Sequence, residues 1–192
     1  MKMKIPAVLI LCVFSVALAL AQTSTNTTIT TRPQSSFASF DFPGSTNTQA
    51  TAITPSGEIV GRYFTADGKQ HGFVLRDGVF TTLDVPGATF TDAAWVNASG
   101  AIVGGYSDSR GGHAYVLSGG TFTTIDFPST TPVCTAGFGI SNAGDVVGVE
   151  FVCSDFFHGD GYLLSHGQFT LLTGQSFLIF ALFGSSAVVK QQ

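Results

Sequence analysis

From about residue 48 onward, short apolar runs alternate with turns rich in Gly, Pro and Asp. In the first stretch, these runs predict four short strands, over 50–54, 58–64, 71–76 and 79–84. Pro55-Ser56-Gly57 predicts the first turn, because Pro presets one φ and Gly accepts a positive φ. Asp77-Gly78 predicts a two-residue hairpin loop of the primed type. The pattern therefore predicts a four-stranded antiparallel unit.

Three sets of landmarks repeat this unit along the chain. The Asp-x-Pro set recurs at spacings of 43 and 42 residues, the Ile-Val-Gly set at 43 and 44, and the aromatic hairpin set at 42 and 47. The first members of the three sets are Phe40-Asp41-Phe42-Pro43-Gly44, the segment 53–61 and the segment 73–80. A period near 43 residues with four strands is typical of propeller blades.

We therefore predict an all-β, repeat-built fold of four-stranded antiparallel units, propeller-like but incomplete, with about three blades. The repeat domain spans 37–172, with units at about 48–90, 91–132 and 133–172 and a lone strand over 37–41 before them. Propellers typically close with four to eight blades. A β-trefoil, which closes with three repeats, is the alternative. Exposed sheet edges favour pairing with other chains, so we also expect self-association.

The N-terminus has the pattern of an export signal over 1–21. Lys2 and Lys4 precede a 16-residue apolar run that ends in Ala19-Leu20-Ala21, so we expect cleavage before Gln22. The run is short for a membrane span, which needs about 20 residues; an uncleaved anchor is the alternative. Residues 22–36, rich in Thr and Ser, predict a flexible leader.

The C-terminal segment 173–192 departs from the repeat. Thr173-Gly174-Gln175 replaces the expected Asp-x-Pro, and an apolar, nearly uncharged stretch follows. It predicts either a degenerate last strand pair or sequence that has drifted from the repeat, and no stable membrane span, because the apolar stretch is only 13 residues long.

Composition excludes several classes of protein. Charged residues make up 10% of the chain, hydrophobic residues 44%, and there are 23 Gly and 18 Phe. A disordered chain would be richer in charge and a coiled coil richer in Glu, Lys and Leu. Eight Lys and Arg against twelve Asp and Glu leave no basic surface for nucleic acid.

Two cysteines remain if the signal peptide, with Cys12, is removed. Cys134 and Cys153 flank the predicted turn 142–145 at equal distances from its centre. In an antiparallel hairpin with that register, the two residues face each other directly, which suits a disulfide in an oxidising compartment. Two free thiols, or a bulge that shifts the register, are the alternatives.

The histidines and periodic acids have structural explanations. His71 and His113 begin equivalent strands, which predicts a shared structural hydrogen bond, and His166 occupies a hairpin position that tolerates positive φ. The repeated acids before x-Pro predict Asx turns; they are Asp41, Asp84 and Asp126. Calcium is a weaker alternative for the loop acids, which are Asp67, Asp108, Asp155 and Asp160.

No catalytic or cofactor motif appears. The chain lacks Gly-x-Ser-x-Gly, a phosphate loop and Cys-x-x-Cys. The recurring aromatic residues predict core between blades, with sugar stacking as the alternative that they share with Trp95. These residues are Phe73, Phe80, Tyr115, Phe122, Tyr162 and Phe169. We predict no catalytic residue, no metal site and no cofactor.

His71-Gly72-Phe73 and His113-Ala114-Tyr115, each followed by Gly-x-Phe-Thr-Thr and Asp-x-Pro, resemble bacterial extracellular HAF repeats, named after a His-Ala-Phe signature. The resemblance covers about residues 37–172. It implies an exported or surface protein with a repeat-built β architecture, and no established enzymatic activity. The third unit departs from the pattern: Asp160 replaces the histidine, and His158 lies two residues earlier in an expected inserted loop.

Together these observations predict a non-enzymatic exported protein, a secreted or surface-bound binding or structural module of bacterial origin, with the periplasm as another destination. Its partner would be an extracellular ligand or surface component of unknown identity. The alternative is a secreted carbohydrate-binding or carbohydrate-active protein.

Overall fold

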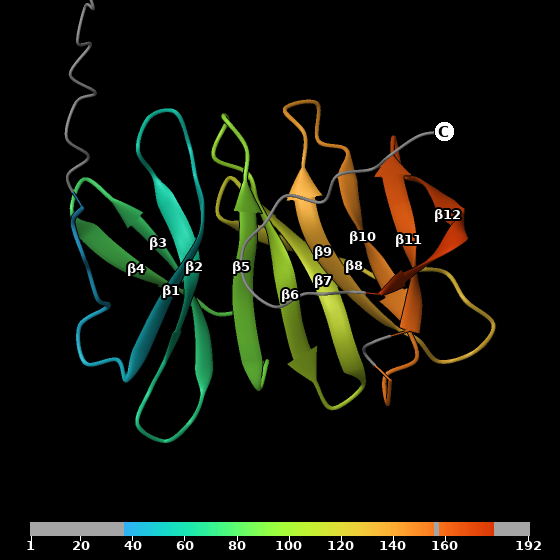
Figure 1. The fold of residues 1–192 in the computed structure, drawn as a ribbon, viewed down its shortest axis with the longest axis horizontal. Helices are drawn as coiled ribbons and strands as arrows, with labels where there is room; N and C mark the ends of the chain where they lie inside the picture. Colours follow the sequence, from blue (N-terminus) through green and yellow to red (C-terminus); the bar gives the residue numbers. More distant parts are fainter. Residues whose placement is uncertain (1–36, 156–157, 179–192) are drawn as a thin grey trace, which may run out of the picture. The chain divides into compact units, whose positions relative to one another are not determined.

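The computed structural model describes residues 37–155 and 158–178. Contacts divide the chain between Ala38 and Ser39, and all three sheets lie in the unit that begins at Ser39. The described part of the chain is all β, and no helix in it is long and apolar enough to cross a membrane. Twelve strands form three four-stranded antiparallel sheets (Figure 1).

Each sheet is a simple meander of one sequence unit. The first contains β1 (Asn47–Ile53), β2 (Ile59–Phe64), β3 (Gln70–Arg76) and β4 (Val79–Leu83). The second contains β5 (Phe90–Val96), β6 (Ile102–Asp108), β7 (Gly111–Ser118) and β8 (Thr121–Ile125). The third contains β9 (Cys134–Ile140), β10 (Val146–Phe151), β11 (His158–Ser165) and β12 (Gln168–Leu178).

The propeller-like prediction is confirmed. Each sheet holds the strands of a single repeat, and within the described ranges the sheets do not close into a ring. This arrangement differs from the β-trefoil alternative, which requires strands of different repeats to combine in one closed barrel. β12 continues to Leu178, six residues beyond the end of the recognisable repeat.

The predicted hairpin loops have the expected backbone. Asp77 and Gly78 have φ of 50° and 76°, and His166 and Gly167 have φ of 51° and 76°. Positive φ at both central positions is the signature of a type I′ turn, which matches the twist of the flanking strands. The sequence position of His166 is thus explained by the turn.

A β-bulge interrupts the first strand of every sheet at the same place. The register shifts between Ala50 and Ala52 in the first sheet, with equivalent shifts in the second and third. The bulge pushes a backbone carbonyl close to the glycine of the Ile-Val-Gly landmark. A Cβ on Gly61 would lie 2.0 Å from the carbonyl oxygen of Gln49, and on Gly148 2.0 Å from that of Ala136. Only glycine fits there, which accounts for its recurrence.

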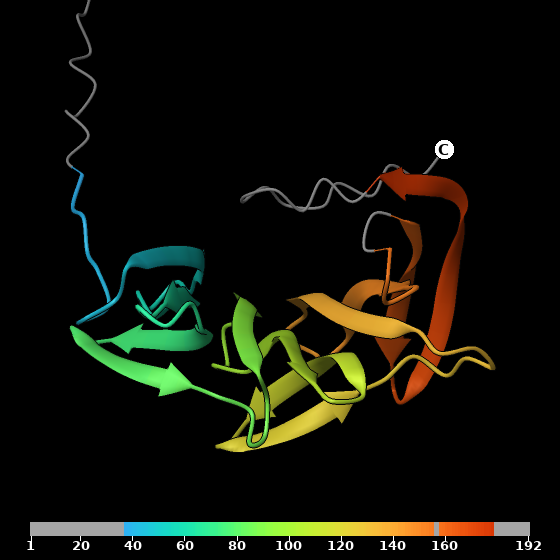
Figure 2. The same cartoon turned by 90° about the horizontal axis from the view of Figure 1, so that it is seen from below.

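The hydrophobic core lies between successive sheets, which pack face to face (Figure 2). One cluster joins the first sheet to the second and contains Val60, Leu83, Ala93, Val96, Ile102 and Tyr115. The other joins the second to the third and contains Val103, Ala114, Ile125, Ile140, Val146 and Tyr162. Alternate residues of β6 therefore face opposite neighbours, since Ile102 belongs to the first cluster and Val103 to the second.

The Asp-x-Pro landmark is the connector that leads into each sheet. Its middle residue donates a backbone N–H to a threonine hydroxyl in the following strand: Val85 to Thr91 at 3.1 Å and Phe127 to Thr135 at 2.9 Å. The bond satisfies a backbone donor at a site where the following proline has none to offer. The connector thus belongs structurally to the sheet that follows it.

The predicted lone strand over 37–41 is wrong, because residues 37–46 form no strand. Phe40 and Phe42 instead pack their rings on the first sheet. The ring of Phe42 stacks on Tyr63 at 3.7 Å between centroids and meets the edge of Phe80 at 5.2 Å. Burial of these rings against the sheet replaces the strand pairing that the sequence pattern suggested.

Candidate functional site

The two signature histidines each bind the aspartate of their own repeat. The Nδ1 atom of His71 lies 3.0 Å from both carboxylate oxygens of Asp84, and that of His113 lies 2.6 Å from Asp126. The rings also stack on tyrosines, with centroids 5.0 Å apart for Tyr63 and His71. The predicted structural hydrogen bond of the histidines is present in both sheets.

The Asx-turn prediction for these aspartates is wrong. An Asx turn needs a backbone N–H two residues after the aspartate, and in each repeat that residue is a proline, which has no N–H. Asp84 and Asp126 accept hydrogen bonds from histidine instead. The aspartate and the histidine are therefore two halves of one cross-strand contact.

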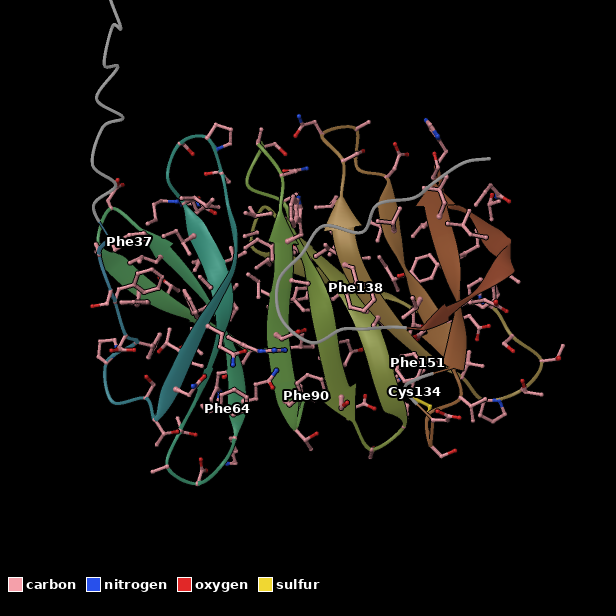
Figure 3. The ribbon with its side chains drawn as sticks, in the orientation of Figure 1. Phe37, Phe64, Phe90, Cys134, Phe138 and Phe151 are labelled. Atoms are coloured by element: carbon pink, nitrogen blue, oxygen red, sulfur yellow. A yellow bond between two sulfur atoms is a disulfide. The ribbon has the colours of Figure 1, made fainter. Side chains whose placement is uncertain are left out.

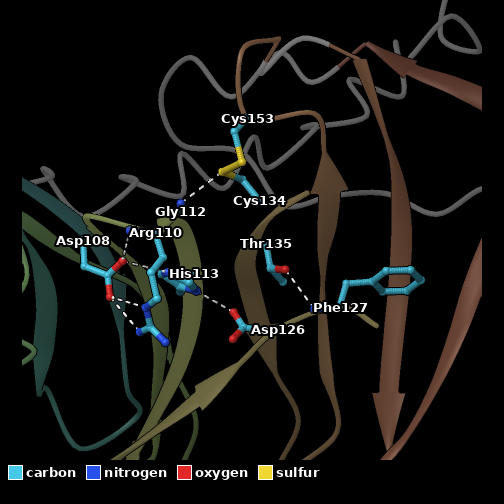
Figure 4. Close-up of a disulfide and its surroundings, with 9 residues drawn as sticks. All are labelled: Asp108, Arg110, Gly112, His113, Asp126, Phe127, Cys134, Thr135 and Cys153. Carbon is cyan, nitrogen blue, oxygen red and sulfur yellow. Dashed lines mark hydrogen bonds and ion pairs between the residues drawn. A yellow bond between two sulfur atoms is a disulfide. The ribbon is translucent and has the colours of Figure 1, made fainter. Parts of the chain in front are cut away.

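In the second sheet the contact extends into a larger polar cluster (Figure 4). The Nε2 atom of His113 lies 3.1 Å from Asp108, whose other oxygen accepts a hydrogen bond from Arg110 at 2.7 Å. Hydrogen bonding to the Arg110 guanidinium holds the pKa of Asp108 well below its usual range. Asp108 and Asp126 thus lie on opposite sides of the buried His113 ring.

The third sheet holds two acids at the same positions. Asp160 pairs with Glu150 across β10 and β11, as His113 pairs with Tyr106 and His71 with Tyr63. Burial raises the pKa of Glu150, and the neighbouring charge of Asp160 raises it further. His158 is the first residue of β11, so its predicted position in an inserted loop is wrong.

Cys134 and Cys153 form a disulfide in the structure, with their Cα atoms 5.0 Å apart. The register from which this pair was predicted is nevertheless wrong. Cys134 faces Phe151, because the pairs next to the turn, such as Val146 with Ile140, are already one residue off the predicted register and the bulge between Val147 and Gly148 shifts it by one more. Cys153 lies in the turn beyond β10. A sulfur atom can bridge this offset because the turn brings the chain back towards β9.

The disulfide also touches the second sheet. The backbone N–H of Gly112 in β7 donates to the Sγ atom of Cys134 at 3.0 Å (Figure 4). A Cβ at Gly111 or Gly112 would come within 3.3 Å of that sulfur atom. The glycine pair therefore allows β7 to approach the disulfide closely.

A cavity of about 520 Å³ lies beside this disulfide and is lined by all three sheets. Arg62 comes from the first sheet, Phe90 and Asp92 from the second, and Phe138 and Phe151 from the third. Figure 3 labels Phe90, Cys134, Phe138 and Phe151, which lie on the side of the strands that carries the disulfide. The lining combines aromatic rings with a few polar groups, as small-molecule sites commonly do.

Asp92 is a largely buried acid of the cavity. Its Oδ1 atom accepts the backbone N–H of Gly105 at 2.7 Å, and its Oδ2 atom lies 3.8 Å from the Arg62 guanidinium. Burial raises the pKa of Asp92, against the smaller lowering effects of Gly105 and Arg62. Sequence reasoning missed this residue, because the other repeats have Gln49 and Ala136 in its place.

Of the residues singled out from the sequence, Asp108, His113 and the two cysteines line this cavity, whereas Asp67 does not. Asp67 accepts from Thr65 and lies 3.4 Å from the Lys69 amine, at the exposed turn of the first sheet. Over residues 37–155 and 158–178, no three His, Cys, Asp or Glu side chains are placed to hold one metal ion. The recurring aromatic residues form one pair in each sheet. The first residue of each pair is fully buried, as predicted for core; these residues are Phe73, Tyr115 and Tyr162.

Trp95 is exposed on β5, and the second residue of each aromatic pair packs edge-on against the first.

Comparison with protein-family models, with curated proteins and with solved structures finds no match to the chain. The case for function therefore depends on the residues themselves.

Proposed function

We propose that this protein is a non-enzymatic, exported repeat protein that serves as a binding or structural module outside the cell. The observation that carries the proposal is the use of the reactive side chains. The signature histidines and aspartates bind each other in equivalent places of two sheets. In the second sheet both ring nitrogens of His113 are engaged, Nδ1 by Asp126 and Nε2 by Asp108, which leaves neither nitrogen for a substrate.

Export is part of the same proposal. The export pattern over 1–21, which lies outside the described residues, and the Cys134–Cys153 disulfide both suit an oxidising compartment. The resemblance to bacterial HAF repeats points the same way. Expression of the full chain in a bacterium tests this part: we expect the exported protein to begin at Gln22 on N-terminal sequencing, and retention in the cytoplasm would contradict it.

A second candidate function is carbohydrate binding in the cavity beside the disulfide. Sugar rings stack on aromatic side chains and bind bidentate polar groups, and this cavity offers Phe90 and Phe138 with the Arg62–Asp92 pair. The acids near the cavity are paired with Arg62, Arg110 or His113, which favours binding over hydrolysis.

A glycan array and a panel of hydrolase substrates separate these functions. A non-enzymatic module predicts no turnover on any substrate. Specific glycan binding that Asp92→Asn weakens, and that the exposed hairpin variant Asp77→Asn preserves, would support the second candidate. Turnover lost in Asp92→Asn and kept in Asp77→Asn would overturn the proposal that the protein is not an enzyme.

A further inference from the structure

The two outermost sheets expose apolar positions that are buried wherever another sheet follows. Val60 and Val103, the central residues of the Ile-Val-Gly landmark, are 0% exposed because they face the next sheet. Val147 occupies the same position in the third sheet and is 41% exposed. The outer face of the third sheet therefore lacks the cover that the same face has in the first and second sheets.

On the first sheet, the face that would meet a preceding sheet is also uncovered. Val96 and Ile140, the last residues of β5 and β9, are 4% and 7% exposed because the preceding sheet covers them. Ile53, the last residue of β1, is 64% exposed. Ala50 repeats the difference, since it is exposed while Ala93, its equivalent in β5, is fully buried.

These two uncovered faces correspond to the two sides of one interface. Within the chain, Val60 packs in the same cluster as Val96, and Val103 in the same cluster as Ile140. The residue that would meet Val147 in a third such interface is the equivalent of Val96 and Ile140. That residue is Ile53.

We propose that a second copy of this chain packs its first sheet against the third sheet, with Ile53 of one copy on Val147 of the other. The interface continues one that the chain already makes twice, so shape and register are matched without new chemistry. Two copies joined in this way at both ends hold six sheets, within the usual range of four to eight for a closed propeller. Such a head-to-tail contact closes into a two-fold ring.

The connector of the repeat is compatible with this arrangement. Residues 173–175 replace the Asp-x-Pro that leads from one sheet to the next, and Phe42 already occupies the connector position on the first sheet. The first sheet of a second copy therefore brings its own connector. The inference is independent of any ligand in the cavity and of the absence of catalysis.

The test is the mass of the exported full chain in solution, measured by light scattering over a range of concentrations. We expect twice the mass of one chain. Val147→Asp and Ile53→Asp each place a charge in a dry contact, which raises the dissociation constant roughly 100-fold. Val79→Asp is the matched control: Val79 is also exposed, but the equivalent residues Thr121 and Gln168 are polar, so this variant keeps the wild-type mass.

Cysteine cross-linking tests the direction of the contact and does not require dissociation. Mixed Ile53→Cys and Val147→Cys chains should form a covalent dimer on a non-reducing gel, whereas neither variant should do so alone. A monomer at every concentration would overturn the proposal, and so would a dimer that both aspartate variants leave intact. Cross-linking of one variant with itself would show a symmetric contact and would also overturn it.

Discussion

The second and third sheets have the same four-stranded topology but use different side chains at the same three positions. The second sheet places Tyr106, His113 and Asp126 in one stacked and hydrogen-bonded set. The third sheet has Glu150 and Asp160 at the first two positions, and the sequence has Thr173 at the third. An attractive contact in one sheet is thus a like-charge pair in the other, which is destabilising across strands.

The third sheet has a covalent bond where the second has none. The Cys134–Cys153 bridge joins the start of β9 to the turn after β10. The buried tyrosine also makes a longer hydrogen bond in the third sheet than in the second. Tyr115 donates to the Asp92 carbonyl at 2.8 Å, and Tyr162 donates to the Ala136 carbonyl at 3.3 Å. The comparison indicates that one repeat can replace polar contacts with a disulfide while the backbone stays the same.

The largest expected effect comes from the disulfide. The bond closes a loop with a sequence separation of 19 residues, so the double variant Cys134→Ser and Cys153→Ser should lower the free energy of unfolding by about 3 kcal/mol. Urea unfolding measures the loss. Hydrogen exchange of this double variant should show the third sheet opening before the second. Equal exchange in these two sheets would contradict a local role for the disulfide.

The buried tyrosines should give a smaller and graded effect. Tyr115→Phe removes the shorter hydrogen bond and leaves the Asp92 carbonyl without its tyrosine donor, which should cost about 1–2 kcal/mol of unfolding free energy. Tyr162→Phe removes the longer bond and should cost less than about 1 kcal/mol. Phe73, the natural phenylalanine at this position of the first sheet, shows that the ring alone fits the core. Equal losses in the two variants would contradict this ranking.

The smallest expected effect is the pH dependence of the acid pair. The raised pKa of Glu150 means that the folded state binds its proton more tightly than the unfolded state does. Stability from this group is therefore present below the ordinary pKa of 4.5 and is lost as the pH rises through the folded value. Glu150→Gln should stabilise the protein at pH 7 and change little at pH 3.

Asp108→Asn in the second sheet is the matched control, with the opposite sign. The Arg110 guanidinium lowers the pKa of Asp108, so the stability it contributes is present above the ordinary value of 3.8 and is lost in acid. This variant should lower stability at pH 7. Thermal unfolding of both variants at the two pH values checks the pair. A loss of stability at pH 7 in Glu150→Gln would show that the carboxylate is favourably held.

Local sequence signals predicted the strands well because each is a short-range property. The hairpin loops at Asp77-Gly78 and His166-Gly167 follow from the φ values that these residues accept. The strand prediction over 37–41 failed because an apolar and aromatic run does not reveal whether its rings will pair as a strand or pack on a neighbouring sheet. The structure shows Phe42 packed on Tyr63 and Phe80.

The candidate site was less predictable than the fold. The repeated positions of His71 and His113 identified their structural hydrogen bond, but the aspartates were assigned to Asx turns. The proline two residues after each aspartate has no N–H and excludes the hydrogen bond of such a turn. Asp92 and Arg62 were missed, because neither recurs at equivalent positions of the other repeats. Residues that come together from different sheets leave no periodic trace in the sequence.

The sequence by itself determined the all-β class, the three repeats and their turns, because these depend on residues within about 43 positions of one another. Only the tertiary structure decided the register around the bulges, the partner of each aspartate, the cavity between sheets and the exposure of Ile53 and Val147. The physical reason is that a bulge adds one residue without changing the hydrophobic pattern, and burial depends on which sheet lies opposite rather than on the residue that becomes buried.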